Sequence, residues 1–161
     1  MAEAMSTQTA GNPLTYEEER EKPMPGLNHS WVQANLIIEF AKQRAYRIHS
    51  ELNLDIDGRH LTPDISLYPR PMAFNLSRDL IRSPVPPATV VEISPQQGSY
   101  EMLKKVNSCF ELGVACVWLV APLMHRIDIH IPDDSVKHYT TGSATDPATG
   151  IPVDADAVFT P

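Results

Sequence analysis

Hydrophobic positions near the start of the chain recur first at a helical spacing and then at a strand spacing. The helical spacing predicts a helix from about Ser30 to Tyr46, capped by Asn28 or Ser30, with one stripe facing a core. The stripe consists of Trp31, Ala34, Ile37, Ile38, Ala41 and Ala45. Beyond this helix, apolar and polar residues alternate imperfectly between Ile48 and Leu67. Asp57-Gly58 interrupts the alternation, and this two-residue turn signal predicts a hairpin.

The pattern in the second half of the chain predicts a strand, a helix and two further strands, in that order. Thr89 to Ser94 is a β-branched run, and Ser99 to Leu112 is amphipathic and ends before Gly113. Val114 to Val120 is continuously apolar, which is typical of a strand covered on both faces. Arg126 to Ile131 alternates, which predicts a half-exposed antiparallel strand that could form an edge of the sheet. The order predicts an α/β fold in which a mixed central sheet is flanked by helices, with a right-handed crossover over residues 89–120.

Polar and proline-rich segments separate these elements. Residues 1–13 lack any period and are expected to be a disordered tail, followed by a single domain over residues 14–161. The charged segment from Thr15 to Lys22 is expected to form one or two helical turns. Residues 69–87 are expected to be a loop with a helical turn at Ser77 to Ile81, and residues 141–161 a tail with a late apolar patch.

Composition restricts the class of protein. The chain has 161 residues, of which 42% are hydrophobic and 20% are charged, which fits a globular fold. No apolar run approaches the ~20 residues of a membrane span, and no basic stretch followed by an apolar one begins the sequence. Two cysteines do not make a disulfide framework, so we expect a reducing, cytoplasmic location and no membrane partner.

The net charge of −7 argues against nucleic-acid binding by the whole surface, because phosphate binding relies on clustered Lys and Arg. A local basic patch is compatible with this charge. So is a carboxylate cluster that holds a metal ion, since the ion neutralises charge that the bare sequence counts as negative.

Three side chains are candidates for chemistry. Glu92 lies within the β-branched run, where a buried carboxylate is costly without a partner, and Asp64 lies at the start of the return strand of the hairpin. With Val106 at the centre of the apolar face of the helix, Lys104 points to solvent. Lys105 lies about 100° from Val106, on the flank, and can bend toward the neighbouring strand. Hard carboxylate oxygens suit Mg²⁺ or Mn²⁺, so two acids and a lysine here suit metal-assisted phosphodiester hydrolysis.

Simpler interpretations of these residues remain open. Glu92 could face solvent from an edge strand. Glu101 lies one helical turn before Lys105 and could hold its ammonium group, but such a pair on a surface is worth only a few tenths of a kcal/mol.

The order of several short motifs resembles the bacterial Uma-type putative restriction endonuclease family of the PD-(D/E)XK nuclease superfamily. The motifs are Pro63-Asp64-Ile65-Ser66, Val91-Glu92-Ile93-Ser94-Pro95, Lys105, Gly113-Val114 and Val117-Trp118-Leu119-Val120. Lys22-Pro23-Met24-Pro25, with Asn28-His29, is similar to the segment before the first helix of that family. The likeness spans roughly residues 15 to 160 and implies a restriction-endonuclease-like core.

The resemblance implies roles for individual residues. It implies that Asp64 and Glu92 ligate the metal and that Lys105, from the following helix, assists catalysis. Much of the superfamily has its lysine at the position of Ser94 instead. Glu101 and Glu51 match acidic positions that support the site. His29 is a further supporting candidate, although a histidine at a helix start is more often a cap or a surface residue.

These observations lead to a main hypothesis and two rivals. We expect an endonuclease that uses Mg²⁺ or Mn²⁺ to hydrolyse phosphodiester bonds in DNA, and that associates as a homodimer. The first rival is a catalytically silent module on the same fold that binds nucleic acid or another protein, which the acidic charge favours. The second is a metal-dependent phosphoesterase acting on a small nucleotide.

Overall fold

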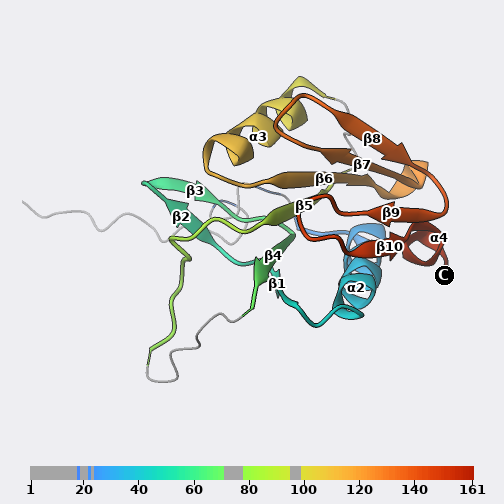
Figure 1. Cartoon of the computed structure of the whole chain (residues 1–161), viewed down its shortest axis with the longest axis horizontal. Helices are drawn as coiled ribbons and strands as arrows, with labels where there is room; N and C mark the ends of the chain where they lie inside the picture. The colour runs from blue at the N-terminus through green and yellow to red at the C-terminus, as the bar shows by residue number, and fades with distance from the viewer. Residues whose placement is uncertain (1–17, 19–21, 23, 71–77, 95–98) are drawn as a thin grey trace, which may run out of the picture.

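A six-stranded mixed sheet lies at the centre of the fold (Figure 1). The computed structural model describes residues 18, 22, 24–70, 78–94 and 99–161. The sheet consists, in spatial order, of β1 (Tyr46–Ser50), β4 (Ile65–Pro69), β5 (Thr89–Ile93), β6 (Cys116–Ala121), β7 (Arg126–His130) and β8 (Val136–Tyr139). The other elements are α2 (Leu27–Ala41), β2 (Leu54–Ile56), β3 (Arg59–Leu61), α3 (Tyr100–Glu111), the 3-10 helix η1 (Pro122–Met124), β9 (Ser143–Thr145), β10 (Pro152–Asp154) and α4 (Ala155–Phe159). The predicted α/β class with a mixed central sheet is confirmed.

The unit β5-α3-β6 forms as the sequence predicts. The two strands run parallel and α3 connects them across one face of the sheet. Ser99 caps α3, since its hydroxyl accepts a hydrogen bond from Met102 N at 3.3 Å. Gly113 follows the helix at φ 96°, a left-handed conformation that favours glycine. All six residues of β6 are buried, in agreement with a strand covered on both faces.

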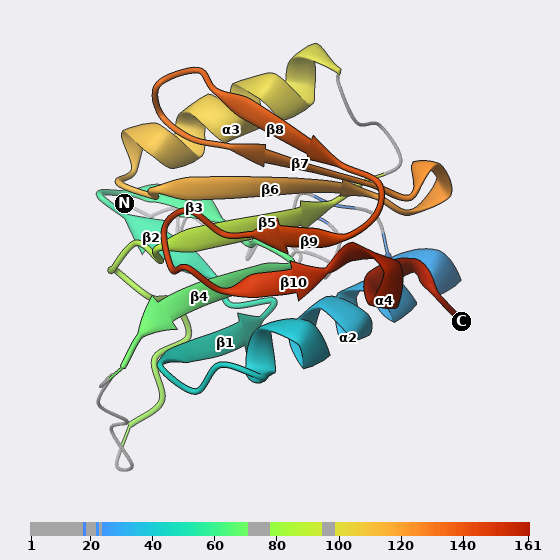
Figure 2. The same cartoon turned by 45° about the vertical axis from the view of Figure 1, so that its right-hand side comes forward.

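Alternate side chains of the strands point to opposite faces of the sheet and belong to two separate hydrophobic cores. On one face, α2, α4 and the β9-β10 pair cover Ile65, Val91 and Trp118. On the other face, α3 covers Val90 and Leu119. Figures 1 and 2 show α2 and α3 on opposite sides of the sheet. Glu92 follows Val91 in β5, so its side chain points to the α3 side.

The position and the buried face of α2 differ from the prediction. The helix begins at Leu27, directly after Gly26, so neither Asn28 nor Ser30 is its cap. Its buried apolar face consists of Val32, Leu36 and Phe40. The exposed members of the predicted stripe are Ala34, Ile38, Ala41 and Ala45. The prediction was wrong because three larger side chains at a spacing of four remove more apolar surface from water than the alanines do.

The predicted hairpin turn is present, but its strands are divided. Asp57 and Gly58 both have positive φ, and they connect the short strands β2 and β3. The flanking residues pair separately, as β1 with β4. Glu51, at φ 56°, ends β1 and separates the two pairs.

The C-terminal region is folded, not a tail. Its buried apolar residues are Ala144, Ile151, Val153, Ala155, Val158 and Phe159. Buried Asp146 organises the turn between β9 and β10, because its Oδ2 accepts hydrogen bonds from Thr89 Oγ1 and Thr149 Oγ1, each at 2.7 Å. The Thr-, Asp- and Pro-rich composition that suggested a tail belongs instead to this hydrogen-bonded turn.

The strand at Arg126–His130 is not an edge. Its residues pair with β6 on one side and with β8 on the other, and Ile127 to His130 are buried. The predicted half-exposed edge at Arg126 to Ile131 is therefore wrong, since an unpredicted strand, β8, covers it. Association of two copies through that strand would require β8 to leave the sheet.

Several expectations concern residues that the structure does not describe. The tail at residues 1–13 lies outside the described residues, as does the segment at residues 15–22 apart from Glu18 and Lys22. Of the predicted helical turn at Ser77 to Ile81, residues 78–81 are described and are not helical. None of the described helices is both long enough and apolar enough to cross a membrane.

Candidate functional site

Two predicted acids face each other across neighbouring strands. Asp64 immediately precedes β4, and Glu92 lies in β5. The antiparallel register pairs Ile65 with Val91, so one residue further along, Asp64 lies opposite Glu92 on the same face of the sheet. Both residues are almost completely buried, at 0% and 2% exposure. Two carboxylates buried this close together need a cation.

Lys22 supplies that cation, and the sequence analysis assigned it no role. Its Nζ lies 3.0 Å from Asp64 Oδ1 and 2.7 Å from Glu92 Oε2, and its side chain is 13% exposed. Burial alone would lower the pKa of the Lys22 ammonium, but the charges of Glu92 and Asp64 outweigh burial and raise it. The only sequence signal was its place in the segment that resembles the one before the family's first helix.

Lys105 lies on the other side of Glu92. Its Nζ is 3.0 Å from Glu92 Oε1, so each oxygen of this carboxylate contacts a different lysine. The side chain reaches from the flank of α3 toward β5, as the helical geometry predicts, and it remains 28% exposed. Lys104, the residue before it in α3, is exposed.

His29 and a backbone amide hold the second oxygen of Asp64. Ile93 N donates to Oδ2 at 2.7 Å, and His29 Nε2 lies 3.2 Å from the same atom. Burial would raise the pKa of Asp64, but the His29 hydrogen bond, the Lys22 charge and the Ile93 amide together lower it to about 2. His29 therefore lies at the site, and Oδ1 of Asp64 is directed at Lys22.

Gln33 is a second residue that the sequence analysis missed. It lies one helical turn after His29 and is buried, and its Nε2 donates to the Asp64 backbone oxygen at 2.9 Å and to Ser50 Oγ at 2.9 Å. These bonds fix the point where β4 begins beside β1. A polar residue one turn from His29 was a usable signal, but the predicted stripe placed the buried face of the helix elsewhere.

The two predicted supporting acids occupy different places. Glu51 lies beside the site: its amide donates to the Asp64 backbone oxygen at 3.1 Å, and its Oε1 lies 3.4 Å from Gln33 Nε2. Glu101 is exposed in the first turn of α3, and no ion pair joins it to Lys105 in the described part of the chain. The structure thus brings Glu51 to Asp64 but does not place Glu101 against the lysine.

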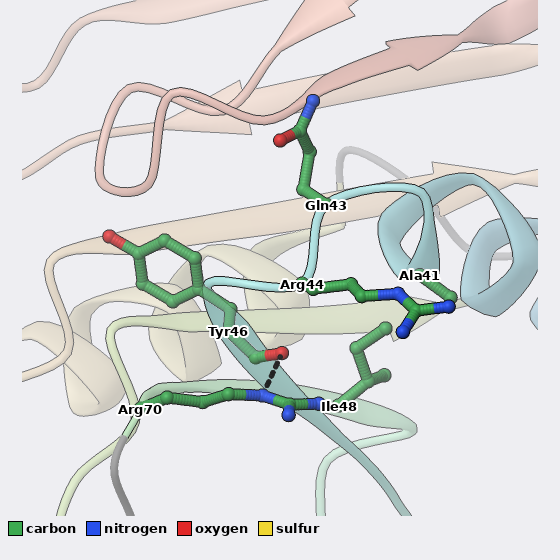
Figure 3. A pocket seen from close by; sticks show the side chains of 6 residues that line it. All are labelled: Ala41, Gln43, Arg44, Tyr46, Ile48 and Arg70. Carbon is green, nitrogen blue, oxygen red and sulfur yellow. Dashed lines mark hydrogen bonds between the residues drawn. The ribbon is translucent and has the colours of Figure 1, made fainter.

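Two hollows on the surface are lined by residues of β1 and its neighbours and by neither of the two acids. One, of about 310 Å³, is lined by the side chains in Figure 3, including Arg44, Tyr46 and Arg70. Since Tyr46 pairs with Pro69 and Ser50 with Ile65, this hollow is at the far end of β1 from Asp64. It is a local basic patch on an acidic protein, but it is separate from the candidate site.

The cysteines do not contribute chemistry. Cys109 and Cys116 are both buried. Burial, with the nearby Glu92 charge, raises the pKa of the Cys109 thiol to about 12, and burial also raises the pKa of Cys116. Thiols in this state are not nucleophiles at neutral pH.

The donor set fits a hard divalent cation. One oxygen from Asp64 and one from Glu92 already converge on a single positive group, the Lys22 ammonium. Within the described ranges, no cluster of three or more His, Cys, Asp or Glu side chains is placed to hold a metal ion. Two carboxylates with water and substrate phosphate oxygens are the usual protein environment of Mg²⁺.

The lowered pKa of Asp64 predicts a specific acid dependence of stability. Its folded pKa of about 2 lies below the ordinary 3.8, so its contribution is present above 3.8 and is lost as the pH falls through about 2. Between about pH 6 and pH 2, the free energy of unfolding should fall by about 2 kcal/mol more in the wild type than in Asp64→Asn. Urea denaturation over this range measures the difference, and parallel profiles of the two proteins would contradict the assignment.

Comparison with known proteins bears on the fold and the family. The Uma2 family model, described as "Putative restriction endonuclease", matches residues 16–155. The crystal structure of a putative nuclease belonging to DUF820 from Anabaena variabilis is similar, with a TM-score of 0.67 and 22% sequence identity. The match covers 85% of this chain and 83% of that chain, and at this identity it shows the shared fold. No curated protein is significantly similar to the chain.

Proposed function

The chain belongs to the Uma2 family of putative restriction endonucleases, and we propose that it is a divalent-metal-dependent endonuclease that hydrolyses phosphodiester bonds in DNA. One observation carries the proposal: Asp64 and Glu92 each direct one oxygen at the same point, which a cation occupies. A buried pair of this kind on the sheet of a nuclease-like fold is suited to a metal-dependent reaction.

Asp64 Oδ1 and Glu92 Oε2 would hold Mg²⁺ or Mn²⁺. When bound, such an ion lowers the pKa of a coordinated water and shields the charge of a phosphate. His29 and the Ile93 amide restrain the other oxygen of Asp64, which keeps its carboxylate oriented toward Glu92.

Lys105 is the residue best placed to act on the substrate. It contacts Glu92 through the oxygen that Lys22 does not contact, and it is partly exposed. An ammonium in this position can position a water molecule or stabilise the negative charge that develops on the phosphate.

A plasmid assay tests the proposal. Supercoiled plasmid should be nicked by the full chain with Mn²⁺ or Mg²⁺. The nicking should stop with excess EDTA and return when the ion is restored. Cleavage that continues unchanged in EDTA would contradict the metal requirement. A panel of small nucleotide esters run in parallel separates the endonuclease from a small-nucleotide phosphoesterase, which would spare the plasmid.

A second candidate is a catalytically silent binding module on the same fold. The specific observation in its favour is that two lysines already balance the two buried carboxylates without a metal ion. A silent module would bind no Mn²⁺ and would nick no plasmid.

A further inference from the structure

The Lys22 ammonium lies where a metal ion shared by Asp64 and Glu92 would lie. It contacts one oxygen of each acid, at 3.0 Å and 2.7 Å, and most of its side chain is buried. This is the geometry of a cation held between two ligands. It differs from a surface ion pair, in which solvent competes for both partners.

A divalent ion and this ammonium cannot use the same two oxygens together. The ammonium nitrogen lies between Asp64 Oδ1 and Glu92 Oε2, and a divalent ion bound to the same two oxygens would need that position and would repel the ammonium charge strongly. The two lysines of the site differ in this respect. Lys105 contacts Glu92 Oε1, which is not directed at the shared point, so Lys105 can stay in place when a metal binds.

The position of Lys22 in the chain allows its side chain to withdraw. Lys22 precedes α2, which begins at Leu27, and it is not part of a described helix or strand. Asp64 and Glu92, by contrast, are fixed by the strand register, and Lys105 is fixed by α3. A flexible four-carbon stem can leave the carboxylates without disturbing the sheet.

We propose that Lys22 is an internal counter-cation that closes the metal-free site and that must be displaced before a divalent ion can bind between Asp64 and Glu92. This inference rests on the proposed function and adds a regulation of the same site. The divalent ion must compete with the Lys22 ammonium for the two carboxylates. The wild type therefore binds the metal ion more weakly than it would if Lys22 carried no charge. Once displaced, the ammonium lacks its two carboxylate partners, and the negative charge of a phosphodiester can replace them. Anionic substrate therefore favours metal loading.

Calorimetric titration of Mn²⁺ into the full chain tests the competition. Lys22→Met keeps much of the aliphatic stem and removes the charge, and it should bind Mn²⁺ about tenfold or more tightly than the wild type. Lys104→Met removes an exposed lysine from the same protein and should leave the affinity unchanged. In the absence of metal, Lys22→Met should also melt at a lower temperature, and Mn²⁺ should raise its melting temperature more than that of the wild type.

A measurement on the unaltered protein covers the case in which Lys22→Met does not fold. Acetylation of lysines by a soluble ester, followed by peptide mass spectrometry, reports how accessible each ammonium group is. Saturating Mn²⁺ should speed the labelling of Lys22 severalfold and leave the labelling of Lys104 unchanged.

The outcomes separate this inference from the proposed function. Equal or weaker Mn²⁺ affinity in folded Lys22→Met, or labelling of Lys22 that bound Mn²⁺ does not change, would overturn the inference and leave the nuclease proposal standing. Binding by Lys22→Met alone would support the competition and show that Lys22 keeps the wild-type site closed. Failure of every variant to bind Mn²⁺ would overturn both.

Discussion

Replacing Asp64 with asparagine is expected to abolish metal-dependent cleavage of DNA, with a loss of about a thousandfold or more in rate. Asparagine has nearly the same shape but carries no charge, so the shared cation position loses one of its two anionic ligands. Neither of the other two candidate acids that the structure describes replaces Asp64 in this position, because Glu51 lies beside the Asp64 backbone and Glu101 is exposed. The nicking rate of supercoiled plasmid at saturating Mn²⁺ measures the loss.

The matched control is Asp79→Asn, which removes an exposed acid from the same acidic protein and should cleave at the wild-type rate. Because Asp64 also anchors Lys22 and the Ile93 amide, circular dichroism and a melting curve must accompany the assay. A folded Asp64→Asn protein that still cleaves within a few fold of the wild type would show that Asp64 is not a metal ligand of this reaction.

Replacing Lys105 with methionine is expected to lower the cleavage rate about a hundredfold while Mn²⁺ affinity stays within a few fold of the wild type. The reason is that the two oxygens of Glu92 contact different lysines. Lys105 contacts Oε1, whereas Oε2 is directed at the shared cation position, where Lys22 lies. Loss of the ammonium should therefore weaken the stabilisation of the negative charge that develops on the phosphate, and it should change the affinity for the metal ion much less.

Parallel titration and nicking assays on Lys105→Met and on the control Lys104→Met make the comparison. Lys104 is exposed, so its variant should match the wild type in both assays. If Lys105→Met loses metal affinity in the same proportion as rate, Lys105 acts by orienting Glu92. If neither changes, it has no role in catalysis.

The sequence predicted best where local pattern and tertiary structure agree. The unit β5-α3-β6 has a capping serine, a terminating glycine and two strongly apolar strands, and each of these signals indicates the same structure. The orientation of Lys105 followed from the same helix, because its apolar face is well defined by Val106 and Cys109. Once the direction of Lys105 is known, its contact with Glu92 requires only that α3 pack beside β5.

The prediction failed where tertiary contacts choose between two local patterns. The helix α2 offers both an alanine-containing stripe and the stripe of Val32, Leu36 and Phe40, and packing in the core that contains Trp118 selects the second. The centroids of the Phe40 and Trp118 rings are 5.2 Å apart. With the wrong stripe, Gln33 could not be recognised as part of the site.

Lys22 could not be derived from spacing at all. It lies 42 residues before Asp64 in the sequence, and the two side chains meet only in the folded chain, at the start of β4. A lysine in a charged, proline-containing segment has no periodic signal, and the register that brings Asp64 opposite Glu92 is itself a product of the folded sheet. Lys22 can be recognised as the partner of the two acids only after their positions in the folded sheet are known.

Titration of Mn²⁺ into the wild type and Asp64→Asn, side by side in a calorimeter, tests most directly whether the buried acid pair is a metal site. The account predicts one specific binding event in the wild type that is absent from the folded Asp64→Asn protein. Equal Mn²⁺ binding by the two proteins would place the metal elsewhere and contradict the account, and so would the absence of binding in both if Lys22→Met also binds none.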